Sequence, residues 1–416
     1  MAASAPAPLP ANRIIFLDKI RYSLVIGVVV LHAACAYAHI IPWWSVRDPV
    51  QRPFFDLLLI VLDIFLMPVL FFLAGFFALP SLSTQGSRRF ISVKLRRLGI
   101  PLLLIGLFFV PLISFIGYRN RTADAHGFFR FWWMQMQTVL DWRWVNYATT
   151  EIGHRHVNDF SLWHLWFISL LLIFFILTAL VYRLSPRCFQ CKVSSASSGS
   201  RSILLALAVA ALTGFLGFSL VNRIYPDAAW SKIAGLIVIQ PTRAPLYIAI
   251  FVLGLYANSR GWFSKRSFPG SIWLWLAGSV VCSAALPAVI ISIGQEPAPI
   301  PWPHALAHGM LRSLACLVFL GFIVTAAQRY GDRPSLIWRH LHAISYDIYL
   351  IHLPFVIVLQ LALLHAPVSI YAKFAITSLA VVGLCWLLAR GVIRPYPVLA
   401  SGLLLAGFAL GCFLSR

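Results

Sequence analysis

Residues 17–32 read LDKIRYSLVIGVVVLH, an apolar run with an arginine near its start and a histidine at its end. About 20 mostly apolar residues are enough to cross a membrane as a helix. Eleven helical residues turn through about 1100° and rise about 16 Å, so Arg21 and His32 are predicted to share one helix face. We expect Arg21 at the cytoplasmic mouth and His32 well into the bilayer, where a titratable group indicates function by default. The alternative is a snorkelling arginine and a histidine that a neighbouring helix satisfies.

The composition extends this interpretation to the whole chain. Of the 416 residues, 60% are hydrophobic and 11% are charged, whereas a soluble domain has about 25% charged residues. The sequence therefore predicts an all-α fold, a polytopic transmembrane helix bundle of about 10–11 spans. The expected spans are 20–41, 55–79, 98–117, 161–182, 202–221, 234–257, 271–294, 305–327, 343–364, 371–389 and 396–413. Residues 1–19 are predicted to form a short cytoplasmic tail, with no secretory cleavage pattern.

The net charge of +21 orients the chain and does not indicate a nucleic-acid partner. With the N-terminus in the cytoplasm, most lysines and arginines fall in inner segments, as the positive-inside rule requires. Metal binding is not expected either. Cys188 and Cys191 form a lone CxxC in an inner linker rich in Ser and Gly, and a structural zinc site needs a second pair of ligands.

The longest loop, from Tyr118 to Phe160, is predicted to face outside and is rich in tryptophan. It contains Trp132, Trp133, Trp142 and Trp144. Their flat rings could pack against sugar rings, or they could anchor the chain at the membrane interface. The sequence leaves both interpretations open.

A second group of polar residues lies in the segment ISYDIYLIHLP of the ninth span. Ser345, Tyr349 and His352 are four and three residues apart, so they are predicted to line one helix face. Asp347 lies off that face and is expected to pair with a different helix. A polar packing seam between helices is the alternative. Another histidine, His164, opens the fourth span at the outer boundary.

Charged residues mark two further places. Asp63 lies inside the second span and needs a partner, for which Arg312 in the eighth span is one candidate. The inner loop SRRFISVKLRRLGIP contains five cations within ten residues. Most of these orient the chain, but Lys94 and Arg97, three residues apart on one helix, could hold a phosphate-bearing ligand by charge-assisted hydrogen bonds.

These segments together resemble a known family. RYSLVIGVVVLH matches the arginine–ten residues–histidine signature of the acyltransferase-3 superfamily of integral membrane O-acyltransferases. Six segments resemble that superfamily in the right order: FLDKIR, FLMPVLFFLAGFF, KLRRLGIPLL, HLWFISLLL, VIQPTRAPLYIAIFVLGLYA and SYDIYLIHLPF. The closest likeness is to the branch that succinylates periplasmic glucans.

The resemblance implies an enzyme of the bacterial inner membrane. It would move an acetyl or succinyl group from cytoplasmic acyl-CoA, a co-substrate and not a bound cofactor, to a hydroxyl of an extracytoplasmic carbohydrate. That acceptor would be a periplasmic glucan or a cell-surface polysaccharide. By motif, His32 is the catalytic histidine, Arg21 is its partner, and Lys94 and Arg97 bind acyl-CoA. The supporting polar residues are then His164, Ser345, Tyr349, His352 and Asp63.

The chain departs from the family at three positions. Leu66 stands where many relatives carry arginine, Ala74 replaces a serine, and Asp347 sits where a glycine or apolar residue is common. An apolar stretch also follows the usual ten spans. We therefore predict a family-like membrane domain over 20–394 and an additional span over 395–416. These departures leave the acyl group and the acceptor open, and the oligomeric state is open too.

The residues fit acyl transfer but leave alternatives. His32 is predicted to act as general base because imidazole titrates near neutral pH, and an acyl-histidine intermediate is the other route. A secondary transporter or flippase with His32, Asp63 and His352 as a proton relay is the competing function. Such proteins are expected to show paired, broken helices in corresponding halves, which this sequence lacks. A non-catalytic assembly factor would not need a buried histidine in line with a basic mouth.

Overall fold

A computed structural model of the chain describes residues 14–122, 126–139, 142, 144–147, 160–189, 199–263, 268–293, 299–331 and 336–414. The CxxC pair, Cys188 and Cys191, lies outside the residues whose side chains are described. The same holds for most of the predicted N-terminal tail.

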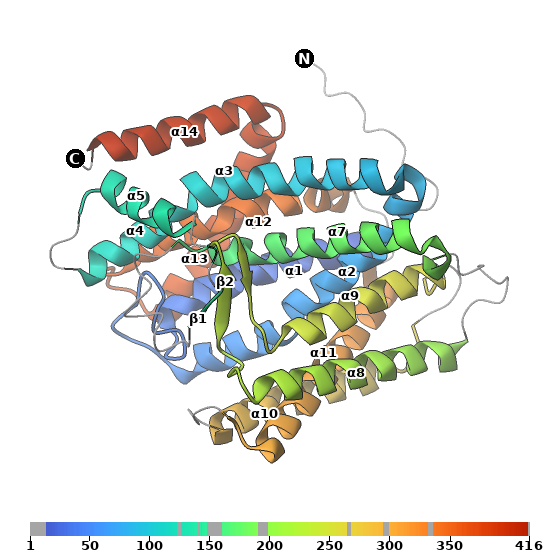
Figure 1. The fold of residues 1–416 in the computed structure, drawn as a ribbon. Coiled ribbons are helices and arrows are strands. Elements are labelled where there is room, and N and C mark those ends of the chain that lie inside the picture. The colour runs from blue at the N-terminus through green and yellow to red at the C-terminus, as the bar shows by residue number, and fades with distance from the viewer. Residues whose placement is uncertain are drawn as a thin grey trace.

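The described chain is predominantly helical, as the sequence predicts, and most helices run roughly side by side (Figure 1). The α-helices are α1 (Ile15–Ala34), α2 (Pro53–Lys94), α3 (Ile100–Phe108), α4 (Val110–Arg121), α5 (Phe128–Val139), α7 (Trp166–Leu184), α8 (Ser200–Asn222), α9 (Ala244–Ser259), α10 (Ile272–Ile293), α11 (Trp302–Gly331), α12 (Leu336–Leu363), α13 (Ile370–Leu388) and α14 (Pro397–Leu414). Shorter helical turns are η1 (Cys35–Tyr37), η2 (Leu95–Gly99), η3 (Trp163–Leu165), η4 (Pro186–Phe189) and η5 (Ala389–Ile393).

Eight helical segments of the described chain are long and apolar enough to cross a membrane. One of them, Pro53–Asn120, bends at Gly86, whose φ of 73° interrupts α2, and returns along the bundle as α3 and α4 (Figure 1). Ala244–Ser259 and Pro397–Phe413 are apolar but shorter. The described chain therefore contains eight candidate spans, where the sequence predicts about 10–11, and the additional span predicted over 395–416 stays a prediction.

Glycines bring the central helices together. A Cβ atom on Gly75 of α2 would lie 2.1 Å from the carbonyl oxygen of Phe251, and one on Gly254 of α9 would lie 2.1 Å from that of Phe72. Membrane helices gain little from apolar burial against one another, so close backbone approach through small residues drives their packing. The α2–α9 pair therefore forms a tightly packed centre for the bundle.

A small antiparallel sheet was not predicted. It has the order β1-β2-β3, formed by Trp144–Tyr147, Trp230–Ile233 and Ile237–Ile239. The span expected over 234–257 was wrong at its start, because β3 and a turn precede α9. Helix α5 and strand β1 likewise occupy part of the predicted outer loop.

Helix α1 also differs from its expected range. It begins at Ile15 and ends at Ala34, so His32 lies in its last turn and not deep within a longer helix. The chain then continues through η1 into the segment that leads to α2. His32 is thereby placed next to Trp44 of that segment and next to His352 of α12.

Candidate active site

Three histidines from distant parts of the sequence meet near the C-terminal end of α1. His32 of α1, His164 of η3 and His352 of α12 have ring centroids 5.1 Å apart for His32–His352, 4.9 Å for His164–His352 and 6.3 Å for His32–His164. His164 and His352 are buried, while His32 is partly exposed. The exposed member is the one that a substrate could reach.

The hydrogen bonds define which nitrogen of each ring carries the proton in the neutral state. His352 Nδ1 is 2.8 Å from the carbonyl oxygen of Tyr349, and a carbonyl accepts only, so Nδ1 carries the hydrogen. The other nitrogen of His352, Nε2, then accepts from Nδ1 of His32 at 2.9 Å. Nε2 of His32 is consequently left with its lone pair, which is the form that a general base requires.

Hydrogen bonds to backbone carbonyls also position His164. Its Nε2 donates to the carbonyl oxygen of Leu350 at 3.1 Å, and its own backbone carbonyl accepts a hydrogen bond from the hydroxyl of Tyr349. Its Nδ1 is buried with no hydrogen-bond partner among the described residues. The predicted face of Ser345, Tyr349 and His352 does contain two residues of this cluster, and Ser345 is buried one turn below Tyr349.

The opposite side of His32 is fixed by an indole and an amide. The ring of Trp44 stacks on His32 with centroids 5.7 Å apart and planes 12° from parallel. Trp44 Nε1 donates to Oε1 of Gln360 at 2.8 Å. The amide nitrogen of Gln360 donates to the carbonyl oxygens of His32 and Ala33, at 3.2 and 3.1 Å. Gln360 thus adds a donor to two carbonyls in the last turn of α1, where the backbone N–H of Cys35 also donates to His32.

The predicted phosphate-binding residues lie near Arg21 of α1, at the end of the bundle that the sequence predicts to face the cytoplasm. Lys94 ends α2 with its ammonium 4.2 Å from the ring centroid of Phe175, and the charges of Arg97 and Arg21 act on it. Arg97 lies in η2, a π-helical turn whose Arg97 carbonyl accepts from the hydroxyl of Tyr346 at 3.0 Å. Such turns are frequent at functional sites. We call Arg21, Lys94 and Arg97 the inner basic cluster.

Asp347 pairs with a different helical element, as the sequence suggested. Its Oδ2 is 2.7 Å from Nε of Arg394, just after the second π-helical turn, η5. Tyr346 and Asp347, adjacent on α12, therefore contact the two π turns η2 and η5. This arrangement fixes α12 five and six residues before His352.

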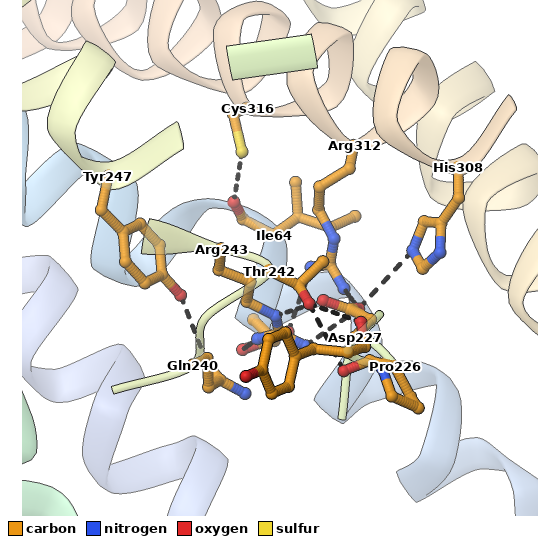
Figure 2. A network of polar contacts seen from close by, with 12 residues as sticks. Ile64, Pro226, Asp227, Gln240, Thr242, Arg243, Tyr247, His308, Arg312 and Cys316 are labelled. Carbon is orange, nitrogen blue, oxygen red and sulfur yellow. Dashed lines mark hydrogen bonds and ion pairs between the residues drawn. The ribbon is translucent and has the colours of Figure 1, made fainter. Parts of the chain in front are cut away.

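Asp63 belongs to a separate cluster of charges. Figure 2 shows Asp227, Arg243 and Arg312 of this cluster. Its carboxylate accepts from Nη1 of Arg312 at 3.1 Å, the pairing that the sequence raised as a candidate, and from Nη1 of Arg243 at 2.8 Å. Arg243 also donates from Nε and Nη2 to Asp227, at 2.7 and 3.1 Å. Nη2 of Arg312 donates to the same carboxylate. His308 Nε2 lies 3.5 Å from Asp227 Oδ2.

This ion cluster, Asp63, Asp227, Arg243 and Arg312, balances its charges. Burial alone would raise the pKa of Asp227, but the guanidinium groups of Arg243 and Arg312 hold that pKa well below its usual range. Both carboxylates are shared between both arginines, so the cluster joins α2, α11, the start of α9 and the segment after α8.

Sequence reasoning missed Asp227 and Arg243. Asp227 lies in a short connection after a predicted span, where a charged residue is unremarkable on its own. Arg243 lies inside the predicted span 234–257, where a charged side chain needs a partner, and this was the signal that the sequence offered. Nothing in the sequence identified which carboxylates would be that partner.

The two clusters are connected by aromatic residues. Trp166 follows His164 by two positions and stacks on Tyr247, with centroids 5.9 Å apart. Tyr247 lies one helical turn after Arg243. At the other side, Leu66 of α2 packs against Gly27 of α1. Leu66, which replaces the arginine of many relatives, is therefore a buried packing residue.

The fold and these clusters define a multi-pass membrane protein whose polar groups gather inside a helix bundle. The chain belongs to the acyltransferase 3 family: the family model, described as an acyltransferase domain, matches residues 14–390. It is accordingly a membrane acyltransferase with many spans.

The chain is also similar to several curated proteins named Glucans biosynthesis protein C. It is 24% identical over 257 residues to that of Escherichia coli O6:K15:H31 (strain 536 / UPEC). The identity is 23% over 255 residues for Escherichia coli (strain K12) and 23% over 256 residues for Shigella dysenteriae serotype 1 (strain Sd197). Each alignment covers 60% of this chain and 59% of the relative, less than two thirds of its length. No solved structure matches the chain.

Proposed function

We propose that the protein transfers an acyl group from cytoplasmic acyl-CoA to a hydroxyl of an extracytoplasmic carbohydrate, with its N-terminus in the cytoplasm of a bacterium and its spans in the inner membrane. One observation carries the proposal. His32, in the signature position, has its Nδ1 hydrogen occupied by His352 and its Nε2 lone pair left over. This is an oriented base on a membrane acyltransferase fold.

The inner basic cluster is the proposed site for the nucleotide end of acyl-CoA. Phosphates bind best to cations that donate charge-assisted hydrogen bonds. Arg21 and His32 are separated by about 16 Å along α1. CoA joins its phosphates to its thioester by a long extended arm, so the phosphates can stay at the cytoplasmic end while the thioester reaches the histidines. Exchanging Lys94 and Arg97 for glutamine should then raise KM for acyl-CoA. The control Arg88→Gln, at an exposed arginine, should leave this KM unchanged.

The reaction at His32 balances as a direct transfer. Nε2 of His32 takes the proton of the acceptor hydroxyl while the hydroxyl oxygen attacks the thioester carbonyl. The C–S bond then breaks, the new ester remains on the acceptor, and the CoA thiolate takes the proton from the imidazolium of His32. His352 stabilises that imidazolium by accepting from Nδ1 throughout. Trapping an acyl-protein after a burst without acceptor would favour the acyl-histidine route instead.

The acceptor is proposed from the relatives. Their name refers to glucan biosynthesis, so a periplasmic glucan is the first acceptor to test. Both succinyl and acetyl groups are candidates. The notion of a proton relay in a transporter or flippase is less well supported, because Asp63 is bound by Arg243 and Arg312 and not by the histidines.

The test is mass spectrometry of envelope glycans from a strain that lacks this protein, complemented with wild type, His32→Ala or the surface control Trp133→Ala. A mass increment that wild type and the control restore, and that His32→Ala does not, would identify the acyl group and its acceptor. Glycans of equal mass in all strains would contradict the proposal. Hydrolysis of acyl-CoA by the purified protein separates an enzyme from a transporter.

A further inference from the structure

Three tryptophans form a ring cluster beside His32. Trp44 stacks on His32. Trp163 meets Trp44 edge-on with ring centroids 5.7 Å apart, and Trp43 lies 5.8 Å from Trp163 and 6.1 Å from Trp44. Trp44 is buried, whereas Trp43 and Trp163 keep part of their surface exposed. Two partly open indoles therefore lie one ring away from the base.

We propose that Trp43 and Trp163 form the acceptor subsite, where a pyranose ring of the carbohydrate packs so that its hydroxyl reaches Nε2 of His32. The inference rests on the proposed function and names its acceptor by chemistry: a neutral sugar ring, with apolar C–H faces and polar hydroxyl edges. Indole matches that chemistry, because it combines a flat apolar body with one N–H donor.

The indole N–H of Trp43 is such a donor, and no described residue accepts a hydrogen bond from it. Its Nε1 is also buried. A buried N–H that stays unpaired costs about 1–3 kcal/mol, so a bound group that accepts from it removes this penalty. A sugar hydroxyl is an acceptor of that kind, and it would fix the ring's orientation as well as its position.

Trp163 is held in a conformation that packing alone does not favour. Its φ is 46°, a left-handed value uncommon for a bulky residue. Its Nε1 donates to Oγ of Ser114 at 2.9 Å, which fixes the ring. Strained residues of this kind cluster at ligand-binding and active sites. Trp163 directly precedes His164 in η3, so one short turn supplies both an indole and a histidine to the same space.

The segment that contains Trp43 is also anchored. Ser45 Oγ donates to the carbonyl oxygen of Ile113 at 3.1 Å. The ammonium of Lys373 donates to the buried carboxylate of Asp48 at 2.9 Å. These contacts keep the indoles in place before a ligand arrives, which lowers the entropy lost on binding.

The tryptophans first considered for this role are placed differently. Trp132 of α5 packs against Phe108 and Phe408, and its Nε1 donates to the carbonyl oxygen of Leu107. It thereby joins α14 to the bundle. Trp133 is 53% exposed on the same helix. Neither is part of the ring cluster around His32, and Trp133 gives a matched control.

The test is direct binding of a short, unacylated glucan oligosaccharide to the purified full-length protein in detergent, measured by calorimetry. We expect Trp43→Ala and Trp163→Ala to weaken binding at least about tenfold, a change that the loss of one aromatic contact can produce. Trp43→Phe should weaken it less, because the ring remains and only the N–H donor is lost. Trp133→Ala should bind as wild type does, and thermal unfolding checks that each variant is folded.

Each outcome is decisive for the subsite. Unchanged affinity in Trp43→Ala and Trp163→Ala, or no binding by folded wild type, would overturn it. Release of the CoA thiol from acyl-CoA, assayed in parallel with the oligosaccharide present, tests the proposed function separately. Thiol release by wild type with no oligosaccharide binding would remove the subsite alone, and oligosaccharide binding without thiol release would remove the acyl-transfer proposal alone.

Discussion

The histidine cluster and the ion cluster lie at similar depth in the bundle but are built on opposite principles. Leu66 of α2 packs against Gly27 of α1. Measured from this contact along each helix axis, Asp63 lies about 5 Å away on α2 and His32 about 8 Å away on α1. The ion cluster shares two carboxylates between two guanidinium groups in a closed ring. The histidines form an open chain that ends on an unused lone pair. A closed ring suits a structural clamp, whereas an open chain suits proton transfer.

The comparison also explains why only one cluster is charged. Burying an ion pair is tolerable when every charge finds a partner and further hydrogen bonds. Neutral histidines avoid that desolvation cost and can still accept a proton during a reaction. A change in the ion cluster should therefore affect stability first, and a change in the histidine cluster should affect activity first.

The largest effect is expected for His32→Ala, which removes the proposed base. General base catalysis contributes about 10²–10⁴-fold, so kcat for acyl transfer by the purified protein should fall by that factor while the unfolding temperature changes little. The control is His39→Ala, which changes an exposed histidine shortly after the end of α1. Full activity without His32 would assign the chemistry to another group.

Arg312→Ala should be the most destabilising change. It leaves Asp63 and Asp227 each one donor short, and breaking a buried ion pair by removing one partner costs about 3–5 kcal/mol. Thermal unfolding in detergent measures the loss. Any protein that remains folded should keep most of its activity. A variant with unaltered stability but no activity would instead move the ion cluster into the chemistry.

His352→Phe tests orientation alone. The ring shape is kept, but the acceptor for Nδ1 of His32 is lost. Misplacing a catalytic group costs about 10²-fold, so kcat should fall while KM for acyl-CoA stays the same, and the pH profile should move. His352→Gln, whose amide oxygen can accept, should recover part of the rate. Equal rates for Phe and Gln would contradict the proposed tautomer.

The smallest effect is a pH dependence of stability from Asp227. Its pKa is lowered in the folded protein, so its contribution is fully present above the unfolded value of about 3.9 and is lost as the pH falls through the lower folded value. Stability should show no transition from this group between pH 5 and pH 8. Below pH 4, wild type should lose stability more steeply than Asp227→Asn, and parallel curves would disprove the assignment.

The sequence predicted the parts of this structure that depend on local pattern. Apolar runs located the spans, and helical spacing placed Tyr349 and His352 on one face, because both signals act within a few turns. The contact of His32 with His352 joins residues 320 positions apart, and no periodicity encodes such a distance. Trp43 and Trp163 were missed for a similar reason: tryptophans at span ends are usually interfacial anchors. Only the fold shows that these two meet beside a histidine.

The π-helical turns η2 and η5 have a consequence for helical phase. A π turn has hydrogen bonds from i to i+5 and so contains one residue more than an α turn. Deleting one residue from either turn would restore an α-helix and rotate one flank against the other by about 100°. Arg97 would then leave the face that meets Tyr346, or Arg394 would leave Asp347. The number of residues in these two turns is therefore constrained by the relative rotation of the flanking helices, whichever residues occupy the turns.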